Sequence, residues 1–96
     1  MAKGYWVVAY QSISDTDKLA AYAKLAAVAI AEAGGTFLAR GGQVVAHEAG
    51  LTERTVLVEF PTYAAAVDAY GSPAYQEALV ALVDAFVRDL RITEGV

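Results

Sequence analysis

Three polar side chains in this sequence have the chemistry to move a proton or to hold an anion: His47, Glu59 and Arg40. His47 is the only histidine, and an unperturbed imidazole titrates close to neutral pH. Glu59 interrupts the apolar stretch TVLVEF at 55–60, where a desolvated carboxylate would acquire the raised pKa that a general base needs. Arg40 precedes a pair of glycines, and a backbone bend there could aim its guanidinium at a carboxylate or phosphate. Glu59 and His47 are therefore the candidate catalytic residues, and Arg40 is a candidate ligand-binding residue.

Each of these residues also has a purely structural interpretation. His47 can be a solvent-facing or interface residue, because no proton partner is identifiable and Glu48 would point to the opposite face of a strand. Arg40 can form a salt bridge with a partner subunit or with Glu59. Glu59 can pair with Arg40 or Arg91, and we expect this structural pairing because ion-pair networks perturb pKa values as well.

Three aromatic residues, Trp6, Tyr10 and Tyr75, complete the set of candidate ligand-binding side chains. They could line an apolar pocket with their polar tips directed inward. Packing in the core or in a dimer accounts for them at least as well. The chain has no cysteine and a single histidine, whereas metal sites normally need two or more such ligands at defined spacing. The sequence therefore predicts no metal site, and we expect no cofactor.

Composition limits the classes of function. Ninety-six residues with a net charge of −4 make one domain, 1–96, and argue against nucleic-acid binding, which needs a basic face. No apolar run is long enough to span a membrane, and the N-terminus lacks the apolar region of a signal peptide. We therefore expect no membrane partner and a cytoplasmic protein of bacterial type. The 57% hydrophobic content exceeds the usual 45–50% or so, which indicates a subunit interface.

Hydrophobic periodicity and capping residues predict the elements that position the candidates. Apolar spacings of three and four residues indicate a helix over 16–33. Thr62 can cap a short helix that ends near Tyr70, and Ser72-Pro73 can start the next one. A stripe of apolar residues at helical spacing predicts that this last helix extends as far as Phe86. Predicted strands occupy 5–11, 36–39, 43–48, 55–60 and 90–95, with the second and third separated by Arg40 and its glycine pair.

This order, β-α-β-β-α(α)-β, is typical of an α+β ferredoxin-like fold with an antiparallel sheet and helices on one face. The strands at 5–11 and 55–60 are apolar on both faces, so the second face needs a cover. A second copy of the same sheet would supply it, giving a homodimer whose sheets pack face to face.

Four short segments carry a family resemblance: GGTFLARGG at 34–42, VEFP at 58–61, SPAYQ at 72–76 and TEG at 93–95. In this order, and beginning from GYW at 4–6, they resemble domain of unknown function 1330, a family of short bacterial proteins in the dimeric α/β-barrel superfamily. The resemblance implies a ferredoxin-like fold and a homodimer, with no established activity. Members often carry an arginine in the last helix near position 82, where this chain has Leu82. Relatives elsewhere in the superfamily include cofactor-free monooxygenases, isomerases and haem-dependent enzymes.

Two hypotheses for function follow. The first is a cofactor-free enzyme acting on a small organic acid or aromatic compound between helices and sheet, with Arg40 holding the anion and Glu59 or His47 moving the proton. The second is a non-catalytic module that binds a small organic molecule or only dimerises. The sequence leaves both open; the environment of Glu59 is the feature that separates them, because an enzyme would keep this carboxylate unpaired.

Overall fold

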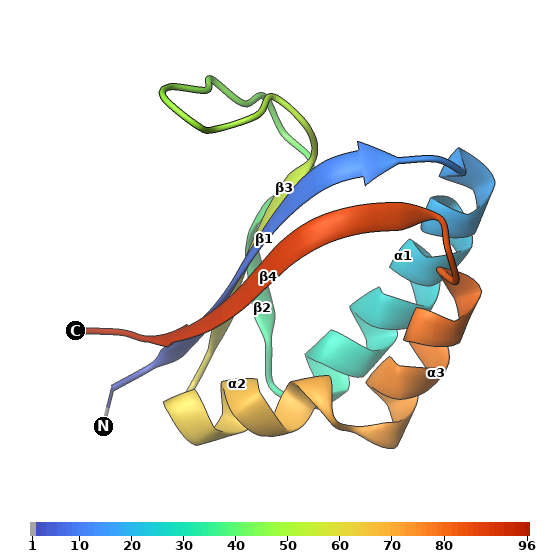
Figure 1. Ribbon diagram of the computed structural model, residues 1–96. Helices are drawn as coiled ribbons and strands as arrows, with labels where there is room; N and C mark the ends of the chain where they lie inside the picture. Colours follow the sequence, from blue (N-terminus) through green and yellow to red (C-terminus); the bar gives the residue numbers. More distant parts are fainter. Residues whose placement is uncertain (1) are drawn as a thin grey trace.

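The computed structural model describes residues 2–96 and contains one four-stranded antiparallel sheet with three helices (Figure 1). The strand order is β2-β3-β1-β4. In chain order the elements are β1 (Gly4–Ile13), α1 (Thr16–Glu32), β2 (Thr36–Arg40), β3 (Thr55–Phe60), α2 (Tyr63–Tyr70), α3 (Pro73–Ala81) and β4 (Phe86–Glu94). The predicted α+β ferredoxin-like fold is confirmed.

All three helices lie on one face of the sheet (Figure 1). Residues that alternate along β1 and β3 point into the layer beneath them, and Trp6, Val58 and Phe60 are the most deeply buried of these. The Trp6 indole N–H donates to the carbonyl of Ala66 in α2 at 2.8 Å. The core is therefore a single layer between the sheet and the helices, with its polar tips hydrogen-bonded as burial requires.

Side-chain caps start the helices. Thr62 accepts a hydrogen bond from the Ala65 N–H and Ser72 accepts one from the Tyr75 N–H, as predicted. Pro73 occupies the first turn of α3, where its missing N–H costs nothing. At α1 the cap is Asp15, whose carboxylate accepts from two backbone N–H groups.

The last helix is shorter than its apolar stripe predicted. It ends at Ala81, and β4 already begins at Phe86. The intervening turn contains Asp84 in the left-handed region, with φ of 61°, and Ser14 holds this turn by donating to the carbonyls of Asp84 and Ala85. The apolar residues after Ala81 therefore pack as a turn and the start of a strand, not as a further helical stretch.

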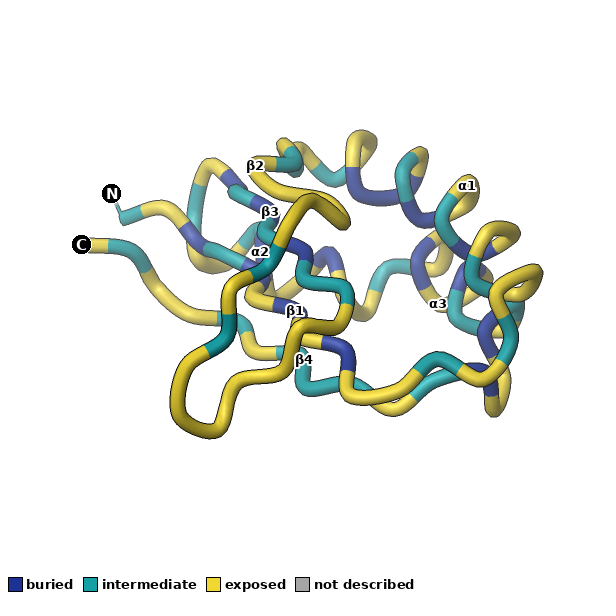
Figure 2. Tube along the Cα trace, turned by 90° about the horizontal axis from the view of Figure 1, so that it is seen from above, coloured by how far each residue is buried: buried dark blue, intermediate teal, exposed yellow. Residues whose placement is uncertain are grey.

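The predicted strand at 43–48 is absent. Gly41 ends β2 with a φ of 71°, and the loop 41–54 projects from the sheet (Figure 1) and is exposed along most of its length (Figure 2). Val45 keeps 82% of its surface exposed. A strand needs a ladder partner; β2 is an edge strand and β3 begins only at Thr55, so these residues have no strand to pair with.

The helix-free face of the sheet is open. Val7 is 38% exposed and Ala9 is exposed too, although β1 is a central strand. The prediction that β1 is central is confirmed, but only its helix-facing side is buried within one chain. Among residues 2–96, no helix is long and apolar enough to cross a membrane.

One prediction concerns Gly4, which lies under the start of α2. A Cβ there would approach Ala66 and the backbone of Tyr63 to 2.7 Å. Because backbone cannot move aside, we expect Gly4→Ala to destabilise the fold by about 1–3 kcal/mol, as overpacking does. Thermal unfolding would measure this as a drop of several degrees for a chain of this size.

The matched control is Gly42→Ala, because a Cβ at Gly42 meets nothing within 4 Å. That variant should stay within about 1 kcal/mol of wild type. Equal melting temperatures for the two variants would contradict the packing of β1 against α2.

Candidate functional site

Arg88 lies at the centre of a polar cluster beneath the sheet. One terminal nitrogen, Nη1, donates to the hydroxyls of Tyr10 and Tyr22, each at 3.2 Å. The other, Nη2, donates to the Tyr75 hydroxyl at 2.8 Å. The Tyr22 and Tyr75 hydroxyls lie 2.6 Å apart and share a further hydrogen bond. We call these four residues the Arg88–tyrosine cluster.

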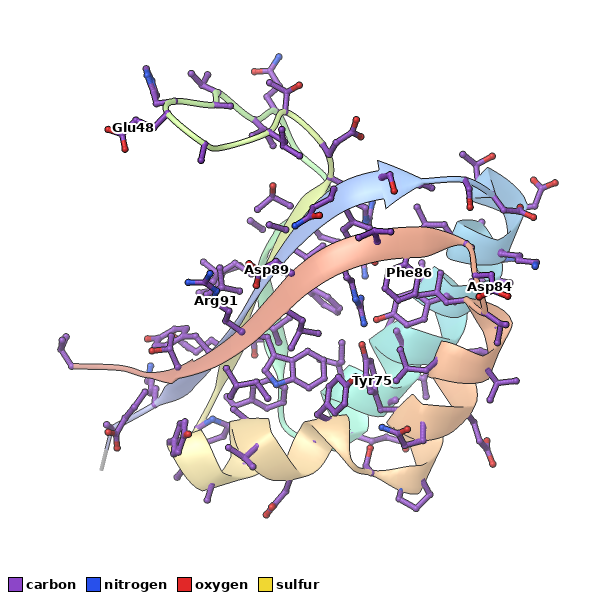
Figure 3. The ribbon with its side chains drawn as sticks, in the orientation of Figure 1. Glu48, Tyr75, Asp84, Phe86, Asp89 and Arg91 are labelled. Atoms are coloured by element: carbon purple, nitrogen blue, oxygen red, sulfur yellow. The ribbon has the colours of Figure 1, made fainter. Side chains whose placement is uncertain are left out.

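The cluster joins four elements. Tyr10 and Arg88 are register partners on β1 and β4, Tyr22 comes from α1, and Tyr75 comes from the first turn of α3. In Figure 3 the Tyr75 ring lies between α3 and the sheet. The Arg88 guanidinium also stacks over the Phe86 ring, 4.7 Å from its centroid. Arg88 is therefore held in one position by hydroxyls and aromatic faces, with no carboxylate in contact.

Burial controls ionisation in the cluster. It raises the pKa of Tyr75 far above the ordinary value of a phenol, and the neighbouring Tyr22 adds to this rise. Burial also raises the pKa of Tyr10, although the positive charges of Arg88 and Arg54 act in the opposite direction. Burial by itself would lower the pKa of Arg88, but the tyrosines outweigh it and the pKa is raised. At neutral pH the cluster thus consists of a charged guanidinium and neutral hydroxyls at Tyr10 and Tyr75.

A pocket opens beside this cluster, between α1 and the sheet. Its atom-free space is about 390 Å³ when the open mouth is included, and about 30 Å³ of it can hold the centre of a water-sized sphere. Apolar side chains such as Trp6, Val58 and Ile30 form much of the wall. Three arginines also line it: Arg40, Arg54 and Arg88. No Asp, Glu or His is among its lining residues.

Arg40 faces the pocket because of a β-bulge. The register of β2 against β3 shifts between Phe37 and Ala39, so that Phe37 lies opposite Val58 and Arg40 lies opposite Val56. Simple alternation would place positions 37 and 40 on opposite faces; the extra residue puts both on the pocket side. The Arg40 guanidinium stacks over the Phe37 ring at 4.7 Å.

Arg54 immediately precedes β3 and lies beside β1, because its carbonyl accepts the N–H of Tyr10 at 3.0 Å. Its side chain packs against Gly41. The Nε of Arg54 is buried and has no hydrogen-bond partner among residues 2–96. A buried N–H without an acceptor is costly, so the fold tolerates an unsatisfied donor at this position.

The ion pairs of the described chain lie away from the pocket. Lys3 pairs with Glu59 at 3.3 Å and Arg91 with Asp89 at 3.1 Å. Asp89 and Arg91 project from the side of β4 opposite the helices (Figure 3). The pocket therefore concentrates positive charge in a chain whose net charge is −4.

The structure separates the predicted site residues into two groups. Trp6, Tyr10 and Arg40 line the pocket. Tyr75 does not line it, but its hydroxyl accepts a hydrogen bond from Arg88, which does. Glu59 lies on the opposite face of the sheet. The predicted pairing of Glu59 with Arg40 or Arg91 is wrong: strand alternation directs Glu59 outward, where its carboxylate accepts from Lys3 Nζ at 3.3 Å and from the Tyr5 hydroxyl at 3.2 Å.

His47 lies in the exposed loop 41–54 and does not line the pocket. Its expected place on a strand is wrong, because the loop makes no ladder. The structure therefore does not bring His47, Glu59 and Arg40 together, and the catalytic role of the first two stays a prediction. Among residues 2–96, no three His, Cys, Asp or Glu side chains converge as metal ligands would.

Sequence reasoning missed Arg54, Arg88 and Tyr22. A signal for both arginines was present in strand alternation. Arg54 shares a face with the apolar positions of 56–60, and Arg88 shares one with those of 86–92. A charged residue on an otherwise apolar strand face is the pattern that indicates a buried functional cation.

One prediction follows from the raised pKa of Tyr75. Above about pH 10 a tyrosine of the unfolded chain loses its proton, whereas folded Tyr75 keeps it. The native state then binds more protons, so the free energy of unfolding falls as pH rises above about 10 and is fully retained below that pH. Urea unfolding at about pH 8 and about pH 11 should therefore show a smaller loss of stability for Tyr75→Phe than for wild type. Equal losses in the two proteins would contradict the buried position of this hydroxyl.

Solved structures share this fold. A protein of unknown function, RPA0582 from Rhodopseudomonas palustris, superposes with a TM-score of 0.72 at 19% identity, covering 99% of this chain and 83% of its own. A proposed antibiotic biosynthesis monooxygenase from Caulobacter crescentus CB15 gives 0.59 at 14% identity, covering 99% and 90%. Another from Nitrosomonas europaea gives 0.56 at 19% identity, with the same coverages. These likenesses establish the fold alone.

None of the curated proteins matches the sequence. The family model described as "Domain of unknown function (DUF1330)" matches residues 3–96. This match spans all the elements of the structure, from β1 to β4, and it confirms the resemblance found in the four short segments. The chain therefore belongs to the family of domain of unknown function 1330.

Proposed function

We propose that this protein binds a small organic acid as its anion, in the pocket between α1 and the sheet. The observation that carries the proposal is the presence of three arginines, and no carboxylate, among the lining residues. Partly desolvated cations with no counter-charge favour an anion far more than water-exposed ones do, because the local dielectric is low. A carboxylate is the small organic group that best matches a guanidinium.

The Arg88 side chain is preorganised to bind a carboxylate. A guanidinium has five N–H donors, and the tyrosine hydroxyls accept three hydrogen bonds from it. Two donors are left, which is the number a bidentate carboxylate uses. Because the tyrosines and the Phe86 ring already fix the side chain, little conformational entropy is lost on binding.

The rest of the wall suits the body of the ligand. Trp6, Val8 and Ile30 present apolar surface, and Phe37 adds an aromatic face near the mouth. The enclosed space of about 30 Å³ holds only a few water molecules, so a ligand must also occupy the open mouth or displace the side chains there. A short aliphatic acid or a flat aromatic acid would require the least movement of this kind.

A cofactor-free enzyme acting on such an acid is the second candidate. The observation in its favour is the pair of hydroxyls at Tyr22 and Tyr75, 2.6 Å apart and joined to Arg88. Such a pair can pass a proton or stabilise charge that develops on a bound carbonyl oxygen. Because the pKa of Tyr75 is raised, this residue stays protonated and would act as a hydrogen-bond donor to such an oxygen, not as an acid. Glu59 and His47 would need an outward-facing substrate or a movement of the loop 41–54 to take part.

We also propose that the protein is a homodimer formed through the open face of the sheet. Val7, Ala9 and Leu57 present apolar surface there, and the chain has no element left to cover it. A second copy of the same face is self-complementary under two-fold symmetry. The 57% hydrophobic content supports the same proposal.

Binding of an anion is tested by titrating the protein with butyrate and following amide chemical shifts. We expect saturable shifts for pocket residues in wild type. Arg88→Lys keeps the charge but loses the planar guanidinium that binds a carboxylate through two N–H groups. Its affinity for butyrate should therefore fall by roughly tenfold, the value of about one charged hydrogen bond. Arg91→Lys is the matched control, because Arg91 lies on the other face and pairs with Asp89. Equal affinities in the two variants would contradict the assignment of Arg88, provided that both remain folded by circular dichroism.

The dimer is tested by light scattering after size exclusion. We expect the mass of two chains for wild type and of one chain for Val7→Glu, because a carboxylate in the centre of an apolar interface would be desolvated without a partner. Val80→Glu is the matched control: Val80 is 70% exposed, but on α3. A monomeric wild type, or a dimer that survives Val7→Glu, would refute this interface.

A further inference from the structure

The three arginines of the pocket differ in what already satisfies them. Arg40 is exposed and stacks on Phe37, so water and an aromatic face compensate its charge. Arg88 is satisfied in part by the tyrosine hydroxyls. Arg54 has a buried Nε without any acceptor among residues 2–96. Arg54 and Arg88 are therefore both half-buried, and neither has an acidic partner among residues 2–96.

These two half-buried cations lie on opposite sides of Tyr10. The carbonyl of Arg54 accepts from the Tyr10 N–H, and Tyr10 is the register partner of Arg88. The three residues thus form a row across three neighbouring chain segments. Because neighbouring strands lie about 4.8 Å apart, the backbones of Arg54 and Arg88 are separated by about 10 Å. Both side chains reach the pocket between them.

The charges of Arg88 and Arg54 both act on the Tyr10 hydroxyl. The Tyr10 hydroxyl accepts from Arg88 at 3.2 Å, and the charge of Arg54 also acts to lower its pKa. The hydroxyl remains a neutral group between two cations. No acid is among the residues that line the pocket. The positive charges of Arg54 and Arg88 therefore repel each other, and they do so more strongly at low local dielectric.

We propose that the ligand of this pocket is a short dianion, an organic acid with two carboxylates, one bound by Arg88 and the other by Arg54. This inference rests on the proposed function and specifies its ligand class. One carboxylate would leave the charge of Arg54 without a counter-charge at low local dielectric. Two carboxylates neutralise both cations. The separation of the two arginines and the small free volume limit the link between the carboxylates to a short chain.

The experiment compares succinate with butyrate, which has the same carbon chain but one carboxylate, by the same chemical-shift titration. We expect wild type to bind succinate roughly tenfold or more tightly than butyrate, because an additional charged hydrogen-bond contact is made. In Arg54→Gln this preference should disappear, and succinate affinity should fall much more than butyrate affinity, because butyrate loses only the longer-range attraction of the Arg54 charge. Arg54→Lys should restore part of the preference, since the charge returns without the planar guanidinium.

The outcomes separate the two proposals. Equal affinity of wild type for succinate and butyrate overturns the dianion and leaves the anion pocket intact. A preference that survives Arg54→Gln also overturns it, because the second carboxylate then binds elsewhere. Failure of wild type to bind either acid overturns the anion pocket itself and the inference with it. Inorganic phosphate that binds more tightly than succinate, with the same dependence on Arg54, overturns the dicarboxylate class.

Two controls keep the result interpretable. Arg91→Gln removes an arginine from the opposite face and should change neither affinity. Arg54 makes no side-chain hydrogen bond within residues 2–96, so its replacement should leave the melting temperature within a few degrees of wild type.

Raising the salt concentration should lower the affinity for succinate more than the affinity for butyrate, because two charges are screened instead of one.

Discussion

The architecture depends on the way in which one half-buried cation, Arg88, is hydrogen-bonded. Desolvating a guanidinium is costly unless hydrogen bonds replace the lost water. Its acceptors are three tyrosine hydroxyls, at Tyr10, Tyr22 and Tyr75, and they come from β1, α1 and α3. The central strand β1, the edge strand β4 and two of the helices must therefore meet at one point. A shift of α3 along the sheet would remove an acceptor and break the bond between Tyr22 and Tyr75 as well, so the cluster fixes the position of both helices.

The choice of hydroxyls as acceptors also determines what the cluster can do. A carboxylate in the place of one tyrosine would satisfy Arg88 more strongly, but it would cancel the charge. Neutral hydroxyls supply acceptors and leave a full positive charge beside the pocket. The acids of the chain lie elsewhere: Glu59 and Asp89 pair with Lys3 and Arg91 away from the pocket. A protein with a net charge of −4 thus has three arginines and no acid among the residues that line this pocket.

Much of the fold could be predicted from the sequence, because local rules and tertiary structure agree there. Thr62, Ser72 and Pro73 cap the helices as their chemistry dictates, and alternation in β3 places Glu59 opposite Val58 correctly. The failures occurred where tertiary contacts decide. The apolar stripe after Pro73 fits a helix as well as a turn and a strand, and tertiary contacts select the second, among them the hydrogen bonds from Ser14 and Lys18 to this turn. That error placed Arg88 near a helix end and concealed it as a pocket residue.

The candidate site was predicted only in part, and for a related reason. Glu59, His47 and Arg40 were chosen because their side chains are reactive, whereas the pocket is formed by residues whose importance comes from position. Arg54 and Arg88 each share the apolar face of a strand, and folding removes both partly from water without giving either a carboxylate among residues 2–96. Partly burying a cation without a counter-charge costs stability, and such costs are concentrated at functional sites. The two half-buried arginines are therefore stronger candidates for a functional role than the exposed histidine or the paired glutamate.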